Sequence, residues 1–259
     1  MLRIISMLAE KIKSNTFLGF FSVSAFLLLW EIAGRLKWID PMFISYPTRV
    51  ISDGIDLVLS GKITPHFIIS VETLLLGFLL AVVVGVLGGL LIGSDERLYA
   101  LFRPYVLFLN SLPKIAIVPL IIIWFGIGFS SKVVIVFLMS LIPILMNSIE
   151  GSRNVNGELV RMARSFKFRK REIMAKVVFF NAIPFVFAGM RMAAGKAVIG
   201  LVIAEVFGYG KGMGYLLSFY GTNFQTSRLM FLVLVFAALN LSLIRVIGIL
   251  EKKVVKWKA

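Results

Sequence analysis

Six long apolar segments divide the chain and predict its architecture. They cover residues 16–36, 67–93, 104–124, 132–149, 183–207 and 229–250. Each is close to the roughly 20 residues that an α-helix needs to cross about 30 Å of hydrocarbon. The pattern therefore predicts an all-α membrane protein with six transmembrane helices, built as a single domain over residues 1–259.

Small residues recur at four-residue spacing in the second and fifth segments. The positions are Gly85, Gly89, Gly93, Gly189, Ala193 and Ala197. A face made of such residues lets the backbone of a neighbouring helix approach closely. We therefore predict close helix packing along both segments.

The third segment is the least regular of the six. It reads SLPKIAIVPLIIIWFGIG, in which Pro113 and Pro119 lack an amide hydrogen and should kink or unwind the helix. Irregular backbone at membrane depth is tolerated only inside the protein or beside a water-filled cavity. Pro113, Lys114 and Pro119 are therefore candidates for the translocation pathway. Lys114 would cost about 2.5–3.5 kcal/mol at a helix centre, so it either lines a wet path, snorkels or finds a partner.

The fifth segment carries the charged residues Arg191, Lys196 and Glu205. Ionisable groups within a membrane are functional candidates, so these three join the predicted pathway. Arg191 and Lys196 lie about 140° apart around a helix and cannot both face one narrow pore. The structural alternative is that one of them pairs with Glu205 or with Glu72 of the second segment.

The charges of the chain flank its apolar segments. The net charge is +15, although 59% of the residues are hydrophobic and the mean hydropathy is +0.95. Basic residues gather before residue 16, between 151 and 178 and after 250, so the positive-inside rule places both termini in the cytoplasm of a multi-pass inner-membrane protein. We expect contact with anionic lipid and no nucleic-acid binding. Residues 37–65 predict an external loop with an interfacial helix.

A short amphipathic helix is predicted in the basic loop 151–178. Its apolar stripe has the spacing i, i+3, i+4 and i+7 and comprises Leu159, Met162, Ala163 and Phe166. Asn156 can cap this helix, and Glu158 suits the positive end of the helix dipole. The stripe fits either a membrane surface or a groove on a partner protein.

The sequence contains few residues or motifs that could support catalysis. The chain has no cysteine, one histidine (His66) and no G-x-x-x-x-G-K-[ST] phosphate loop, so we predict neither a catalytic residue nor a metal site. Any ATP must be bound by another protein. The glycine-rich GYGKGMGY segment is more typical of a tight external turn than of a ligand loop.

Several stretches together resemble one protein family. They are SLPKIAIVPLIIIWFGIG, PILMNSIEGSRNV, LVRMARSF and AIPFVFAGMRMAAGKAVIGLVIAE followed by GMGYLL. This combination is similar to the binding-protein-dependent ABC transporter permeases of the MetI-like type, in the branch that imports alkanesulfonates, taurine, nitrate or vitamin precursors. The resemblance covers nearly the whole chain.

In that family the loop helix is a coupling helix with an EAA motif, which docks on the ATP-binding subunit. The resemblance implies an ATPase-coupling set of Leu159, Arg161, Met162, Ala163, Ser165, Phe166 and Lys167. The sequence departs from the motif, because Arg161 stands at the glutamate position and Lys167 at the glycine position. Phe179 and Phe180 also replace the family's Leu-Pro pair.

The same resemblance implies a transport mechanism and its partners. Two permease copies would form a homodimer, an ABC ATP-binding subunit would bind ATP and Mg, and an extracytoplasmic substrate-binding protein would deliver the solute. This chain itself would bind no cofactor and would not be an enzyme. The competing interpretation is a membrane scaffold or channel without an ATPase partner.

Overall fold

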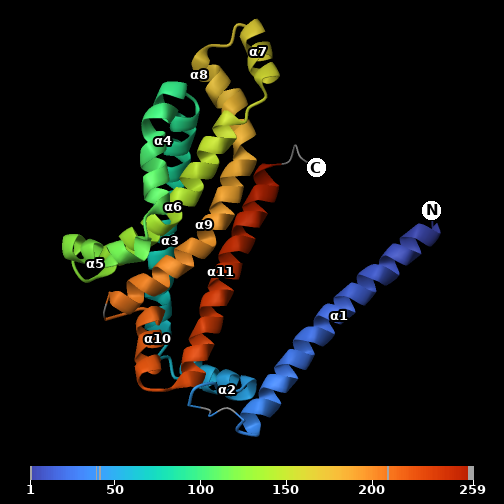
Figure 1. Ribbon diagram of the computed structural model, residues 1–259, viewed down its shortest axis with the longest axis vertical. Coiled ribbons are helices and arrows are strands. Elements are labelled where there is room, and N and C mark those ends of the chain that lie inside the picture. Colours follow the sequence, from blue (N-terminus) through green and yellow to red (C-terminus); the bar gives the residue numbers. More distant parts are fainter. Residues whose placement is uncertain (1, 39, 41, 209, 256–259) are drawn as a thin grey trace. The chain divides into compact units, whose positions relative to one another are not determined.

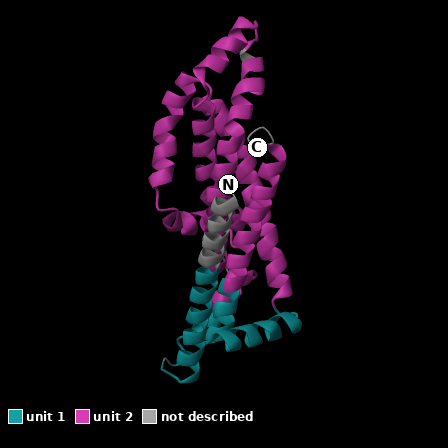
Figure 2. Ribbon diagram, turned by 90° about the vertical axis from the view of Figure 1, so that its right-hand side faces the viewer, with its two compact units in different colours: residues 1–62, 219–233 teal, residues 63–218, 234–259 magenta. Residues whose placement is uncertain are grey.

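The computed structural model describes residues 2–38, 40, 42–208 and 210–255, which contain helices and connecting segments but no strand (Figure 1). The chain forms two compact units (Figure 2). Unit 1 comprises Met1–Lys62 and Phe219–Val233, and unit 2 comprises Ile63–Ser218 and Leu234–Ala259.

Unit 1 contains α1 (Leu2–Arg35), α2 (Pro47–Leu59), the end of α10 (Met213–Thr222) and the start of α11 (Thr226–Val254). Its Phe17–Arg35 part is apolar enough to cross a membrane and only 6% of it is buried, as expected for a helix surrounded by lipid. The Glu31 carboxylate accepts hydrogen bonds from the backbone and hydroxyl of Thr48, at 3.0 and 2.6 Å. These bonds tie α1 to the start of α2. The first residue of α2 is Pro47, and its missing amide hydrogen costs nothing there, because the first amides of a helix have no partner within the helix.

Three long helices form the centre of unit 2 and lie side by side: α3 (Thr64–Gly93), α6 (Phe129–Arg153) and α9 (Phe179–Phe207) (Figure 1). The predicted packing through small residues is confirmed. A Cβ atom at Gly89 would lie 2.4 Å from that of Ser148, and one at Gly189 would lie 2.8 Å from that of Asn147. Only glycine allows α6 to approach both neighbours this closely.

The third predicted span is broken into two helices, α4 (Glu96–Ser111) and α5 (Lys114–Phe125), which are bent by 97°. The break lies at Leu112 and Pro113, where Leu112 is extended because a proline disfavours helical backbone in the residue before it. The expectation of irregular backbone at Pro113 is confirmed. The expectation at Pro119 is wrong, since α5 continues through that residue.

The remaining helices of unit 2 are α7 (Gly157–Ser165), α8 (Lys170–Ile173) and the π-helical turn η1 (Met174–Val178), which runs directly into α9. Within the described residues, five helices are long and apolar enough to cross a membrane, and α4 with α5 makes a sixth if the bent pair is one span. The prediction of an all-helical membrane fold is therefore confirmed.

Candidate functional site

The helix α7 is well defined at both ends. The Asn156 side chain accepts a hydrogen bond of 2.8 Å from the Glu158 amide, so the predicted cap is confirmed. At the other end, Lys167 has a φ of +58°. Its amide bonds the Arg164 carbonyl at 2.8 Å, and the Phe168 amide bonds the Ala163 carbonyl at 3.1 Å. This is the Schellman arrangement, in which glycine normally takes the left-handed position.

The apolar stripe of α7 is divided between two faces. Ala163 is 6% exposed and belongs to a small core with Ile173 and Val178, against which Val160 also packs. Three other members of the predicted stripe face outward: Leu159 is 44% exposed, Met162 56% and Phe166 72%. One face therefore anchors the helix to its own chain, while the other leaves large apolar side chains unpartnered within the described residues.

The polar members of the predicted coupling set lie on the accessible side of the segment. Arg161, Ser165 and Lys167 are all exposed. The Ser165 hydroxyl donates to the Arg161 carbonyl at 3.2 Å and so remains within its own helix. The two basic residues that depart from the family motif are therefore available to a partner.

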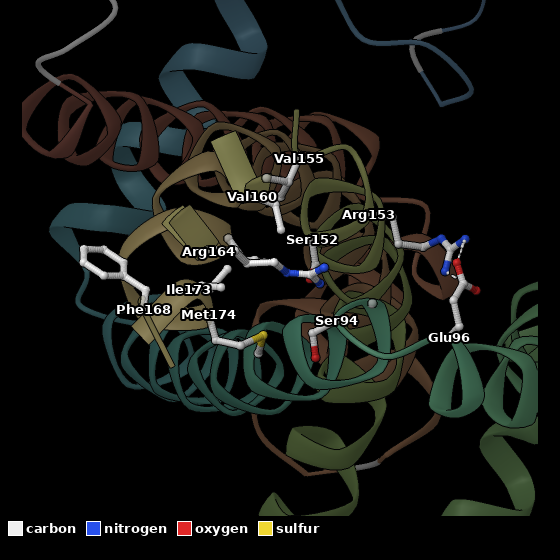
Figure 3. Close-up of a pocket in the computed structure, with 12 residues that line it drawn as sticks. Ser94, Glu96, Ser152, Arg153, Val155, Val160, Arg164, Phe168, Ile173 and Met174 are labelled. Carbon is white, nitrogen blue, oxygen red and sulfur yellow. Dashed lines mark hydrogen bonds and ion pairs between the residues drawn. The ribbon is translucent and has the colours of Figure 1, made fainter. Parts of the chain in front are cut away.

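A cavity of about 450 Å³ lies behind α7 (Figure 3). Figure 3 shows the Arg164 side chain extending across it, and Arg153 at its margin in an ion pair with Glu96. The Arg153 guanidinium donates to both Glu96 oxygens, at 2.9 and 3.0 Å, and stacks over the Tyr99 ring at 3.8 Å. Sequence reasoning missed this cluster, because its members come from α4, α6 and α7.

The predicted pathway residues separate into four places in unit 2. Pro113, Lys114 and Lys196 line one groove of about 360 Å³, where the start of α5 meets α9. Pro119 lies exposed on α5 beyond this groove. Arg191 pairs instead with Glu251 of α11, so the structural alternative in which it pairs with Glu205 or Glu72 is wrong.

Glu205 is completely buried at the end of α9. Its carboxylate accepts bonds from the Ser70 hydroxyl at 2.6 Å and the Gly214 amide at 2.8 Å, and the same hydroxyl accepts a bond of 2.8 Å from the Met213 amide. Gly212 has a φ of +125°, and a Cβ atom there would lie 2.3 Å from the Glu205 carboxyl carbon. The carboxylate thus clamps the glycine-rich segment against α3.

Two further side chains hold the same segment. Lys132 is only 3% exposed, and its ammonium donates to the Lys211 carbonyl at 2.6 Å. His66 accepts a bond of 3.1 Å from the Gly212 amide and stacks on the Tyr215 ring. Sequence reasoning identified the glycine-rich turn but not these anchors, which come from α3 and α6. A buried charge on the helix just before the turn, Glu205, was the one available signal.

Comparison with known proteins agrees with this architecture. Residues 81–256 match the family described as binding-protein-dependent transport system inner membrane component. The chain is 29% identical to SsuC of Bacillus subtilis strain 168, whose name refers to aliphatic sulfonate transport, over 93% of this chain and 87% of the relative.

Two other relatives carry different substrate names. The taurine transport system permease protein TauC of Escherichia coli K12 is 23% identical, over 91% of this chain and 88% of its own length. The formylaminopyrimidine transport permease protein ThiX of Halalkalibacterium halodurans is 26% identical, over 90% and 92%.

Proposed function

The chain belongs to the family of binding-protein-dependent transport system inner membrane components, and on that premise we propose that it carries a small sulfonate, nitrate or vitamin-precursor solute by alternating access. It is a membrane-spanning permease subunit of an ABC importer and not an enzyme. The sulfonate, taurine and formylaminopyrimidine relatives support the sulfonate and vitamin-precursor classes. A substrate-binding protein would deliver the solute from outside.

The outward face of α7 carries this proposal. Leu159, Met162 and Phe166 are exposed on a helix that is anchored from behind by Ala163. We assign this face to a groove on the ATP-binding subunit, which would hold ATP and Mg, with Arg161, Ser165 and Lys167 as polar contacts around it. Movement of α7 would then reach the bundle through α8, η1 and α9, which follow it along the chain.

The translocation pathway would pass the break between α4 and α5. Broken helices beside solute sites are a recurring feature of transporters, because unpaired backbone groups need a wet or buried setting. Pro113, Lys114 and Lys196 share the groove at this break. In this proposal Pro119 continues the α5 wall, while Arg191 and Glu205 support the pathway through their contacts with Glu251 and the glycine-rich segment.

Assembly and orientation complete the proposal. Two copies of the chain would enclose one pathway as a homodimer surrounded by membrane lipid, with both termini in the cytoplasm. The basic residues around α7 and at the end of α11 support this orientation, because they would meet anionic headgroups and the ATPase on that side.

The test is substrate-stimulated ATP hydrolysis in the reconstituted importer. Replacing Met162 and Phe166 by Asp should abolish stimulation and solute uptake, because charged side chains cannot enter an apolar groove without a large desolvation cost. Glu158→Gln, at an exposed position of the same helix outside this set, is the matched control and should retain most of both activities.

Two results would overturn the proposal. Stimulation that survives the double Asp variant would remove α7 from the coupling role. Purification of the wild-type chain without a stoichiometric nucleotide-hydrolysing partner would favour a scaffold or channel.

A further inference from the structure

The groove at the start of α5 holds two lysines from separate parts of the chain. Lys114 is the first residue of α5 and is partly buried, whereas Lys196 lies on α9 and is exposed. Both line the same space of about 360 Å³, together with the side chain of Asn110 and the apolar residues Met139 and Ile199. The groove therefore holds two side chains of the same charge.

Nothing in the groove compensates this positive charge. None of its lining residues is acidic, and neither lysine forms an ion pair within the part of the chain that the structure describes. Two other basic residues on the long helices of unit 2 do have partners, since Lys132 donates to a carbonyl and Arg191 meets Glu251. Two like charges held together without a counter-charge are unfavourable, and an anion between them removes that cost.

The local backbone adds to this preference. The first residues of α5 face the groove, and no side chain caps that end of the helix. A helix N-terminus carries a partial positive charge and unpaired amides, which favour an anion that the lysines already attract. Asn110 supplies an amide that can donate to the same oxygen atoms.

We propose that Lys114 and Lys196 form a subsite for the negative group of a small organic anion, such as a sulfonate, with the apolar wall of Met139 and Ile199 beside its carbon skeleton. This proposal rests on the transport function above and names the chemistry of its solute. It places part of the selectivity within the permease itself.

The absence of cysteine from the chain makes a direct test available. In the reconstituted importer, Lys196→Cys would be modified by two thiol reagents of similar size, the anionic sulfonatoethyl methanethiosulfonate and its cationic trimethylammonium counterpart. A cleft lined by one sign of charge raises the local concentration of the opposite ion by tenfold or more. Adding Lys114→Gln should therefore lower the ratio of anionic to cationic rates at least about tenfold.

A matched position shows whether this effect is local. Lys176→Cys lies on η1, is exposed and does not line the groove, so Lys114→Gln should leave its rate ratio unchanged. The reciprocal pair, Lys114→Cys with and without Lys196→Gln, should repeat the tenfold change. An unchanged ratio in both pairs would overturn the subsite.

Competition separates a free anion from a lipid headgroup, which offers the same charge. In nanodiscs of phosphatidylcholine alone, ethanesulfonate should slow modification of Lys196→Cys in a saturable way. Protection that appears only when phosphatidylglycerol is added would overturn the solute subsite and assign the groove to lipid. The coupling function is read separately, because Lys114→Gln should leave co-purification with the ATPase intact whether or not the subsite exists.

Discussion

The two ends of the unit 2 bundle differ in whether their polar and apolar side chains have partners within the described residues. Around Glu205, a buried carboxylate has its oxygens satisfied and holds a turn with bonds of 2.6–2.8 Å. Around α7, the large apolar side chains of Met162 and Phe166 are exposed. Lys167 has a left-handed backbone conformation, which is unfavourable for a residue other than glycine. The first end is complete within its own chain, whereas the second leaves exposed the apolar side chains that the proposed coupling role assigns to a partner.

The largest effect should follow from breaking the complete end. Glu205→Ala would leave the hydroxyl hydrogen of Ser70 and the amide hydrogen of Gly214 buried without an acceptor, at about 1–3 kcal/mol each. We expect the free energy of unfolding to fall by about 3 kcal/mol or more, measured by thermal unfolding in nanodiscs. Glu72→Ala, at an exposed position on α3, should change it by less than about 0.5 kcal/mol. Equal effects of the two changes would contradict the clamp.

An intermediate effect should separate the two faces of α7. Ala163→Asp places a charge in the core with Ile173 and Val178 and should cost about 2–4 kcal/mol of stability. Met162→Asp alters an exposed neighbour and should leave the unfolding temperature nearly unchanged while ATPase stimulation falls. Hydrogen exchange over residues 157–168 measures the stability of the helix, and ATP hydrolysis measured in parallel shows the loss of stimulation. A stable Ala163→Asp helix would refute the anchored face.

The smallest effect should be a gain in stability at the partner-dependent end. Lys167→Gly relieves a left-handed residue and should stabilise the end of α7 by about 1 kcal/mol. Ser165→Gly, within the helix, should instead lower its stability by about 0.5–1 kcal/mol. Amide exchange at residue 168 reports both changes. If Lys167→Gly and Lys167→Asn reduce ATPase stimulation equally, the lysine charge and not the backbone contacts the partner.

The sequence was most informative where a local pattern has one physical meaning. Apolar length predicted the helices, Pro113 predicted the break, and Asn156 predicted the start of α7, because each depends on neighbours along the chain. Family motifs then identified the permease. The length of an apolar run did not predict the 97° bend, since the direction of α5 depends on the helices it meets.

Partner choice among charged residues was the least predictable feature. Arg191 meets Glu251, sixty positions away, whereas the sequence offered Glu205 and Glu72 as the alternative partners. The stripe of α7 likewise reads as one surface in the sequence, yet Ala163 turns inward because residues of η1 and the preceding loop cover it. Periodicity states which residues share a face but not what covers that face.

By itself, the sequence determined that this protein is a helical membrane permease with a capped amphipathic loop helix and a break in the third membrane helix at Pro113. Hydrophobic length, missing amides and capping side chains act within a few residues, so they can be read in one dimension. Only the tertiary structure decided that Lys114 shares a groove with Lys196, that Glu205 clamps the glycine-rich turn and that α7 keeps one face open. Burial and electrostatic pairing depend on distances between segments remote in the chain, and those distances exist only once the helices have packed.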